Sequence, residues 1–236
     1  MKGRSAPEGL GAGGRRRAHG LRVGMRTLFA SVALGAWLAA FAALAGSDDP
    51  AASPAEAVFA GGCFWCMQTP FETLDGVLGT TVGYAGHGAP DPTYEEVSSG
   101  TTGYAEAVRI RFDPDRIDYD ALLDVFWRNV DPLTADGQFC DHGPQYRSAI
   151  FAQNDDQVRI ARASKRALEG SGRFDRPIVT EIVRDAAFFP AEEEHQHYAS
   201  KNPIRYRFYR YFCGRDARLE TLWGDEAVAH DPGPRG

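Results

Sequence analysis

The stretch AVFAGGCFWCMQTPFETL, residues 57–74, carries the strongest structural signals in the chain. Its first part, AVFAGG, predicts a short strand that runs into a Gly-Gly turn, and CFWCMQTPFETL predicts the helix that follows. Cys63 and Cys66, two of the four cysteines, lie three positions apart, which places both thiols on one helical face. The pair fits a structural disulfide, half of a metal site, a dithiol redox couple, or a nucleophile beside a second thiol.

The neighbouring sequence excludes some of these four possibilities for the cysteine pair. Cys63 opens the predicted helix, where backbone N–H groups and the helix dipole stabilise an anion, so we expect its thiol to ionise readily. The alternative is a small buried residue without a chemical role. A zinc site would need a second cysteine pair or a pair of histidines at matching spacing, and the sequence has neither. Met67, rather than histidine, follows Cys66, which excludes haem attachment. The motif therefore favours a dithiol redox couple.

The first 45 residues differ in composition from the rest. Seven basic residues and one acidic residue lie there, and residues 28–45 contain no charge. The apolar run ends in Ala43-Leu44-Ala45, a small-residue cleavage pattern, so the segment predicts a secretory signal and a periplasmic protein. The alternative is an uncleaved membrane anchor, because 18 apolar residues can just span a bilayer. We hypothesise that translation starts at Met25, directly before the apolar run.

The remaining sequence predicts one catalytic domain. Residues 46–56 are small, acidic and Pro-containing and are interpreted as a linker; residues 57–224 form the domain, and 225–236 form a flexible tail. Without residues 1–45 the formal net charge changes from −6 to −12, which argues against a nucleic acid as partner. Four cysteines in an exported protein often form two disulfides, but their positions do not resemble the disulfide framework of a small domain.

Strand and helix patterns alternate irregularly along this domain, which predicts an α+β fold: a two-layer sandwich with a mixed sheet. Residues 86–103 are rich in Gly, Pro, Ser and Thr and predict a long functional loop. Asn154 and Gln157 form a capping-box pattern, and Gly170 is the expected helix stop. Further strands are predicted at 76–86, 104–112, 147–153 and 178–183, and helices at 118–130, 155–169 and 190–201.

Glu106 is the most unusual charged residue of the domain. In YAEAVRIRF, residues 104–112, it is in phase with the apolar Val108, Ile110 and Phe112 and therefore points to the apolar face of the strand. A carboxylate in that position is costly, and desolvation would raise its pKa and make it a proton donor near neutral pH. The alternative is a one-residue bulge that returns the side chain to solvent.

Other polar candidates are less specific when each is taken alone. Asp141 lies in a turn-forming segment directly before a predicted strand and has a turn role as its alternative. Tyr84 and Tyr146 border Gly-rich turns, where packing is the simpler interpretation. His195 and His197 form an H-x-H pattern in a predicted helix, where they do not share a face, so we do not expect them to bind a metal.

Taken together, several ordered motifs resemble the peptide methionine sulfoxide reductase A family over nearly all of residues 57–224. This resemblance implies a ferredoxin-like core, reduction of the S-epimer of methionine sulfoxide, free or in proteins, and no bound cofactor. It further implies a thioredoxin-like electron donor and, we expect, a monomer. The motifs are GGCFWCMQTPFE, VGYAGH, PTYEEVSSGTTGYAEAV, ADGQFCDHGPQYRSAIF and EEHQHYASKNP.

The resemblance also implies a role for each site residue. A nucleophilic thiolate would attack sulfur and become a sulfenic acid, an aromatic pocket would hold the substrate methyl group, and polar groups would hold and protonate the oxygen. The nucleophile is then Cys63; the pocket is Phe64 and Trp65; the carboxylate is Glu106; and the further hydrogen-bonding residues are Tyr84, Tyr146 and Asp141.

The second thiol is where this chain departs from the family. Many members have resolving cysteines in a glycine-rich C-terminal tail, whereas here the end reads NPIRYRFYRYFCGRD, residues 202–216. We favour Cys66 as the resolving cysteine because it lies one turn from Cys63, with Cys213 as the alternative, and we expect Cys140 to be a small buried residue. Two other functions stay open: a general thiol–disulfide oxidoreductase that uses CFWC, and a non-enzymatic exported domain with structural disulfides.

Overall fold

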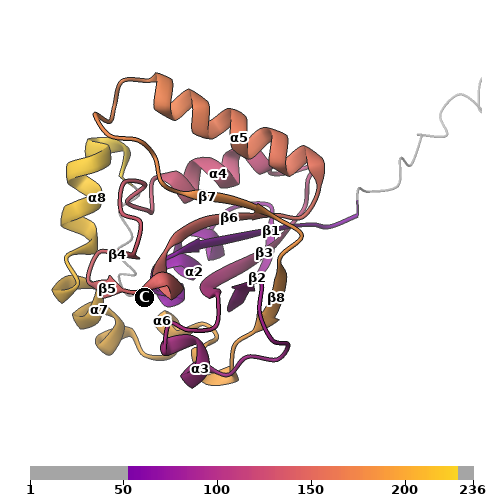
Figure 1. Cartoon of the computed structure of the whole chain (residues 1–236), viewed down its shortest axis with the longest axis vertical. Helices are drawn as coiled ribbons and strands as arrows, with labels where there is room; N and C mark the ends of the chain where they lie inside the picture. Colours follow the sequence, from indigo (N-terminus) through magenta and orange to yellow (C-terminus); the bar gives the residue numbers. More distant parts are fainter. Residues whose placement is uncertain (1–52, 228–236) are drawn as a thin grey trace, which may run out of the picture. The chain divides into compact units, whose positions relative to one another are not determined.

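A six-stranded, curled mixed sheet forms the centre of the protein in the computed structural model, which describes residues 53–227 (Figure 1). The predictions for residues 1–45 lie outside this region. The strand order across the sheet is β7-β6-β1-β3-β2-β8, and β4 and β5 form a separate two-stranded ribbon. The strands are β1 (Ala55–Gly61), β2 (Val77–Gly86), β3 (Tyr104–Phe112), β4 (Gly137–Gln138), β5 (Asp141–His142), β6 (Ser148–Ala152), β7 (Glu181–Arg184) and β8 (Ala187–Pro190).

The strand directions confirm an α+β domain with a mixed sheet. β1 pairs antiparallel with β3 and β6, β2 pairs antiparallel with β3 and β8, and β7 is parallel to β6. The four central strands follow one another along the chain as β1, β2, β3 and β6. One helix lies between β1 and β2, and another lies between β3 and β6. Two interleaved β-α-β units of this kind bring the end of β1 to the middle of the sheet.

Helices cover one face of the sheet and gather at one end of it (Figure 1). Asp118 caps α4 and Asn154 caps α5 by accepting a backbone N–H of the first turn, which accounts for where these helices begin. The helices are α2 (Phe64–Glu72), α3 (Tyr94–Ser98), α4 (Tyr119–Trp127), α5 (Asp155–Gly170), α6 (Tyr198–Lys201), α7 (Pro203–Phe212) and α8 (Arg215–Trp223), with short 3₁₀ turns η2 (Pro144–Tyr146), η3 (Glu193–His195) and η4 (Gly224–Glu226).

The large apolar side chains lie between the sheet and the helices. Phe59 of β1 is fully buried, with its ring centroid 5.6 Å from that of Phe71 and 5.0 Å from that of Phe126. Val108 and Ile110 of β3 belong to the same core, as the alternation of that strand predicts. Burial of each such side chain contributes about 1.5–3 kcal/mol, so this face holds α2 and α4 firmly on the sheet.

The opposite face of the sheet carries small side chains. Its buried cluster consists mainly of alanines, and Phe188 of β8 packs against them. Small residues on one face and large ones on the other let the strands approach closely on the small side, which favours the curl of the sheet. The alanines of this cluster are Ala60, Ala85, Ala105, Ala107 and Ala149.

Several elements differ from the sequence-based prediction. β1 begins at Ala55, two residues before the expected start of the domain. The loop at 86–103 contains α3, and the helix predicted at 190–201 is divided into η3 and α6 because His197 adopts a left-handed backbone conformation, with φ of 53°. Within residues 53–227, no helix is both long enough and apolar enough to cross a membrane.

The pairing of β2 with β8 depends on a residue without a side chain. A Cβ atom at Gly83 would lie 2.2 Å from the backbone oxygen of Phe189, whereas one at Gly79 in the same strand would meet nothing within 4 Å. We expect Gly83→Ala to lower the free energy of unfolding by about 1–3 kcal/mol and Gly79→Ala to change it by less than about 0.5 kcal/mol. Denaturant unfolding of both variants measures this, and equal effects would contradict it.

Candidate active site

Neighbouring side chains lie very close to the backbone of the turn between β1 and α2. Gly62 has a φ of 86°, a conformation that glycine adopts without strain. A Cβ atom at Gly61 would lie 2.5 Å from Cγ1 of Val130, and one at Gly62 would lie 2.7 Å from Cβ of Gln138. Both glycines are therefore required for the chain to turn directly from the central strand into the helix, and Cys63 is placed at the start of that helix.

Two carboxyl groups complete the N-terminus of α2. Cys63 occupies the N-cap position but makes no capping bond with its side chain. Instead, the backbone N–H of Phe64 donates to Oε2 of Glu106 at 3.0 Å, and the backbone N–H of Cys63 donates to the carboxylate of Asp141. Because free N–H groups at a helix start need acceptors, this capping holds both acids beside the Cys63 thiol.

These groups line one cleft, to which α3, β5 and α7 each contribute a side chain. Six of the residues predicted from the sequence lie in it, and they come from four separate parts of the chain. Tyr94 and Tyr209 also line the cleft, although the sequence analysis assigned them no role. The lining residues are Cys63, Phe64, Trp65, Tyr94, Glu106, Asp141, Tyr146 and Tyr209.

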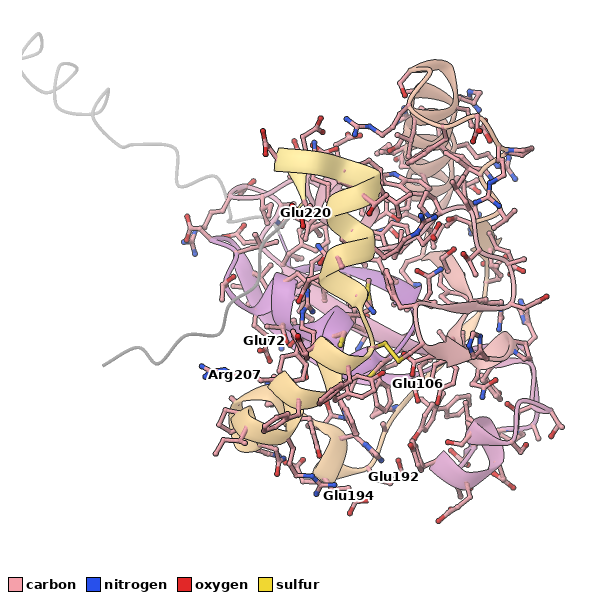
Figure 2. All side chains as sticks on the ribbon, turned by 90° about the vertical axis from the view of Figure 1, so that its left-hand side faces the viewer. Glu72, Glu106, Glu192, Glu194, Arg207 and Glu220 are labelled. Atoms are coloured by element: carbon pink, nitrogen blue, oxygen red, sulfur yellow. A yellow bond between two sulfur atoms is a disulfide. The ribbon has the colours of Figure 1, made fainter. Side chains whose placement is uncertain are left out.

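Tyr84 is not among the residues that line this cleft, although the resemblance implied that it forms hydrogen bonds to the substrate there. It lies opposite Glu106 in the β2–β3 register and is fully buried, but its hydroxyl donates to Oε2 of Glu192 at 2.7 Å. The other oxygen of Glu192 accepts the backbone N–H of Tyr94 at 2.9 Å. Tyr84 therefore supports Tyr94 through Glu192, and Tyr94 is the residue that reaches the cleft (Figure 2 labels Glu192 and Glu106).

Tyr209 links the C-terminal helix α7 to the cleft. Its hydroxyl lies 2.8 Å and 2.7 Å from the two carboxylate oxygens of Asp141, so one side chain fixes the orientation of the acid. Trp65 forms the neighbouring wall: its ring stacks on Tyr198 with centroids 3.7 Å apart and meets the edge of Tyr209. The cleft thus has an aromatic side formed by α2 and α7, and Tyr198 of α6 packs against Trp65.

Glu106 is buried as the sequence predicts, with 3% of its surface exposed. Burial raises its pKa to about 8, against the lowering effect of the hydrogen bond from Phe64, and Asp141 adds repulsion. The side chain is therefore protonated at neutral pH and can donate a proton into the cleft.

The two thiols of the CFWC motif do not ionise as the helix start alone predicts. Cys63 is 6% exposed, and burial raises its pKa further than the hydrogen bond to Cys66 and the nearby acids do. The hydrogen bond from Cys63 lowers the pKa of Cys66 to about 6, with help from Arg215 and Arg210. The two thiols are therefore coupled through their hydrogen bond, and the nearby arginines favour a negative charge on the pair.

The other two cysteines form a disulfide, which corrects the prediction that Cys140 is a small buried residue. Cys140 is exposed, and its bond to Cys213 joins the turn between β4 and β5 to the C-cap of α7. The disulfide is the yellow bond between two sulfur atoms in Figure 2. Cys63 and Cys66 are both free and buried. While the Cys140–Cys213 disulfide is intact, Cys213 has no free thiol that could react with Cys63.

The histidines of the H-x-H pattern have separate surroundings. His195 is buried among the rings of Phe64, Trp65 and Tyr94, and burial lowers its pKa, so its imidazole is neutral. His197 faces away, with Nδ1 2.5 Å from Oε1 of Glu72. The two rings therefore do not converge on a shared ligand position.

Residues 55–227 match the model of the family described as peptide methionine sulfoxide reductase. The chain belongs to the peptide methionine sulfoxide reductase family. It is 48% identical over 171 residues to the peptide methionine sulfoxide reductase MsrA of Bacillus pumilus, which covers 72% of this chain and 96% of that protein. It is 50% identical over 168 residues to MsrA of Bacillus licheniformis, which covers 71% and 93%.

Solved structures agree with this assignment. Mxr1 from Saccharomyces cerevisiae in reduced form is 32% identical, with a TM-score of 0.59, over 66% of this chain and 89% of that protein. Methionine sulfoxide reductase A of Corynebacterium diphtheriae is 31% identical, with a TM-score of 0.57, over 66% and 78%. Almost the whole length of these two bacterial relatives corresponds to this domain.

Family membership establishes the activity. The enzyme is a peptide-methionine (S)-S-oxide reductase, which reduces methionine S-sulfoxide to methionine. This activity excludes the two alternatives, a general thiol–disulfide oxidoreductase and a non-enzymatic domain. A cleft that combines a thiol pair, a protonated carboxyl group and aromatic walls agrees with this reaction.

The raised pKa of Glu106 predicts the pH dependence of the reductase. The side chain donates its proton only while protonated, so the rate should fall as the pH rises through about 8. We expect Glu106→Gln to lower the single-turnover rate by about 10²–10⁴-fold and to abolish this fall.

Glu72→Gln is the matched control, because Glu72 pairs with His197 and does not line the cleft. Its rate and its fall above pH 8 should equal those of the wild type. Single-turnover reduction of methionine sulfoxide, measured from pH 5 to 10, tests both variants. A Glu106→Gln enzyme that keeps the wild-type rate would contradict the role of Glu106.

Proposed function

We propose that Cys63 is the nucleophile and that its sulfur attacks the sulfur atom of methionine S-sulfoxide in this cleft. The observation that carries this proposal is the capping of α2, which holds the Cys63 thiol beside an acid whose pKa is about 8. Phe64 and Trp65 form the apolar side of the cleft and receive the substrate methyl group.

The proton balance of the attack follows from the shared charge of the thiol pair. Cys63 passes its proton to the Cys66 thiolate, with which it is hydrogen bonded, as its sulfur bonds to the substrate sulfur. Glu106 donates its proton to the sulfoxide oxygen. The S–O bond to methionine then breaks, the oxygen passes to Cys63 as a sulfenic acid, and methionine is released.

The remaining polar groups hold the oxygen during this transfer. Tyr94 and Tyr146 both line the cleft, and burial raises the pKa of each phenol, so both remain donors at neutral pH. Asp141, held by Tyr209, orients the backbone of Cys63. In this assignment Tyr94, rather than Tyr84, forms the hydrogen bond to the substrate oxygen. Tyr84 holds Glu192, which in turn accepts the backbone N–H of Tyr94.

We propose that Cys66 resolves the sulfenic acid. Cys66 transfers its proton to the Glu106 carboxylate directly or through water and attacks the Cys63 sulfur, which forms a disulfide. Glu106 returns that proton to the departing hydroxyl group, which leaves as water. Its hydrogen bond to Cys63 means that no large motion is required. Cys213 is the alternative, but it is bonded to Cys140 in this structure and must first be reduced.

A thioredoxin-like dithiol protein is the proposed electron donor, because the catalytic disulfide must be reduced by thiol exchange and the chemistry uses no bound cofactor. We further propose a monomer without nucleic-acid partners. The order of β1, α2, β2, β3, α4 and β6, with the strand order β6-β1-β3-β2, supports a two-layer, ferredoxin-like core.

Export is proposed for the N-terminal segment. Residues 1–45, or 25–45 if translation starts at Met25, would direct the reductase to the periplasm, with cleavage after Ala45 and a linker before β1. The mass of the mature protein tests this. A mass equal to that of a chain beginning at Gly46 supports a cleaved signal. A mass equal to that of a chain that still contains residues 28–45 overturns cleavage and supports the anchor.

The cysteine assignment predicts distinct outcomes for three variants. In epimer-resolved assays with dithiothreitol, the wild type should reduce only the S-epimer and Cys63→Ser should be inactive. Cys66→Ser should release one equivalent of methionine and accumulate a sulfenic acid when no reductant is present. Cys213→Ser should turn over normally, because Cys213 is not used.

Peptide mapping after one equivalent of methionine sulfoxide identifies the bond that forms. A Cys63–Cys66 disulfide is expected, with Cys140–Cys213 unchanged. A bond between Cys63 and Cys213 would overturn the choice of Cys66, and an active Cys63→Ser enzyme would overturn the mechanism as a whole.

A further inference from the structure

Arg215, the first residue of α8, is a buried cation that forms no ion pair with a carboxylate of residues 53–227, although Asp141 lies near enough to feel its charge. Its side chain is 1% exposed, and within residues 53–227 no Asp or Glu oxygen lies within 4 Å of its guanidinium. Arginine remains charged at all accessible pH values. Because an isolated buried charge is costly, the location of its compensating negative charge needs an explanation.

The guanidinium lies directly beneath the turn that carries the thiol pair. Nη2 donates to the carbonyl oxygens of Gly61 at 3.0 Å and Asn129 at 2.7 Å, and it contacts Sδ of Met67 at 3.0 Å. A Cβ atom built on Gly62 would lie 3.3 Å from Nη1. The charge is thus fixed against the two residues that precede Cys63 and one that follows Cys66.

The contacts of Arg215 leave part of its charge uncompensated. The face of Phe139 lies 4.4 Å from Cζ and supplies a cation–π contact. Nε and Nη1 have no hydrogen-bond partner among the described residues. The neighbouring buried Arg210 differs, because Nε donates to Asp216 at 2.9 Å. Of these two cations, only Arg215 therefore lacks an anionic partner of its own.

We infer that Arg215 is an electrostatic positioning residue whose charge is balanced by the negative charge shared by the Cys63–Cys66 pair. The inference rests on the proposed role of this pair in catalysis. Arg215 favours the state with one proton and one thiolate, from which Cys63 can attack. Its influence on Cys66 and on Asp141 has the sign expected of a fixed positive charge near both groups.

The same charge affects the oxidised enzyme. When Cys63 and Cys66 form a disulfide, the negative charge disappears while Arg215 remains buried. The dithiol form is therefore stabilised relative to the disulfide, which makes the disulfide a better oxidant and easier for an external dithiol to reduce. Arg215 would thus assist the first step and the last step of the cycle without touching the substrate.

Two substitutions separate charge from structure. Arg215→Gln keeps an amide that can donate to the carbonyl groups of Gly61 and Asn129 but removes the charge, whereas Arg215→Lys keeps the charge and loses the planar fork. The matched control is Arg218→Met on the same helix, since Arg218 pairs with Asp131 and not with the thiol turn. Thermal unfolding of each variant reports its structural cost.

The readout is thiolate absorbance at 240 nm from pH 4 to 10, measured on the reduced full-length protein after subtraction of the Cys63→Ser/Cys66→Ser protein. For the wild type we expect a first midpoint near pH 6. Arg215→Gln should raise it by one pH unit or more, a roughly tenfold loss of thiolate relative to thiol. Arg215→Lys and Arg218→Met should keep the wild-type midpoint even where the unfolding temperature falls.

An Arg215→Gln protein that folds and keeps the wild-type midpoint overturns the inference. If that variant does not fold, Arg215→Lys decides: an unchanged midpoint supports a role of the charge, and a midpoint raised as high as that of an ordinary thiol contradicts it. None of these results changes the epimer-resolved activity of the wild type, so failure of this inference and failure of the proposed function are distinguishable.

Discussion

The capping of α2 by Glu106 and Asp141 is the interaction on which the reactive end of the reductase depends. The helix starts without a side-chain cap of its own, so its first N–H groups recruit acids from β3 and β5. This is a structural requirement of any helix start, but here it also fixes the distance between an acid and a thiol. The hydrogen bonds that stabilise the fold are thus the same ones that assemble the chemistry.

This arrangement has an electrostatic cost that shapes the thiol pair. Acids and burial beside Cys63 oppose a permanent negative charge on the attacking sulfur, whereas Cys66 faces the arginines and Tyr206. The nearby arginines therefore favour negative charge on the Cys66 side of the pair. A buried thiol that stays protonated is also less open to unspecific oxidants, which suits an enzyme that works on oxidised proteins.

The sequence predicts most of the sheet and much of the cleft, because the relevant signals are local. The alternation of residues 104–112 correctly places Glu106 on the apolar face, and the Gly-Gly turn before Cys63 correctly predicts a helix start. Tyr94 could have been found from the capping box of Thr93 and Glu96, which marks the start of α3 within the long loop.

Long-range pairings could not be found in this way. The spacing of Tyr206, Tyr209, Arg210 and Cys213 fits one helical face, but the pattern does not say that this face meets Asp141 and Cys140, about 70 residues earlier in the chain. The direction of the Tyr84 hydroxyl likewise depends on Glu192, which is distant in sequence. The pKa of a buried thiol depends on its assembled surroundings, so the helix start alone does not reveal that burial and the nearby acids raise the pKa of Cys63.

The disulfide between Cys140 and Cys213 also has a consequence for biosynthesis. Four cysteines can pair in three ways, and only the pairing that joins Cys140 to Cys213 leaves the CFWC pair to itself. Cys213 emerges 73 residues after Cys140, whereas Cys63 and Cys66 are exposed as soon as the first strand is made. In an oxidising compartment the nascent chain must therefore delay or undo early crosslinks to the catalytic cysteine. Maturation of this enzyme becomes a problem of thiol sorting, in which burial of the first pair by the later helices decides which sulfur atoms remain available.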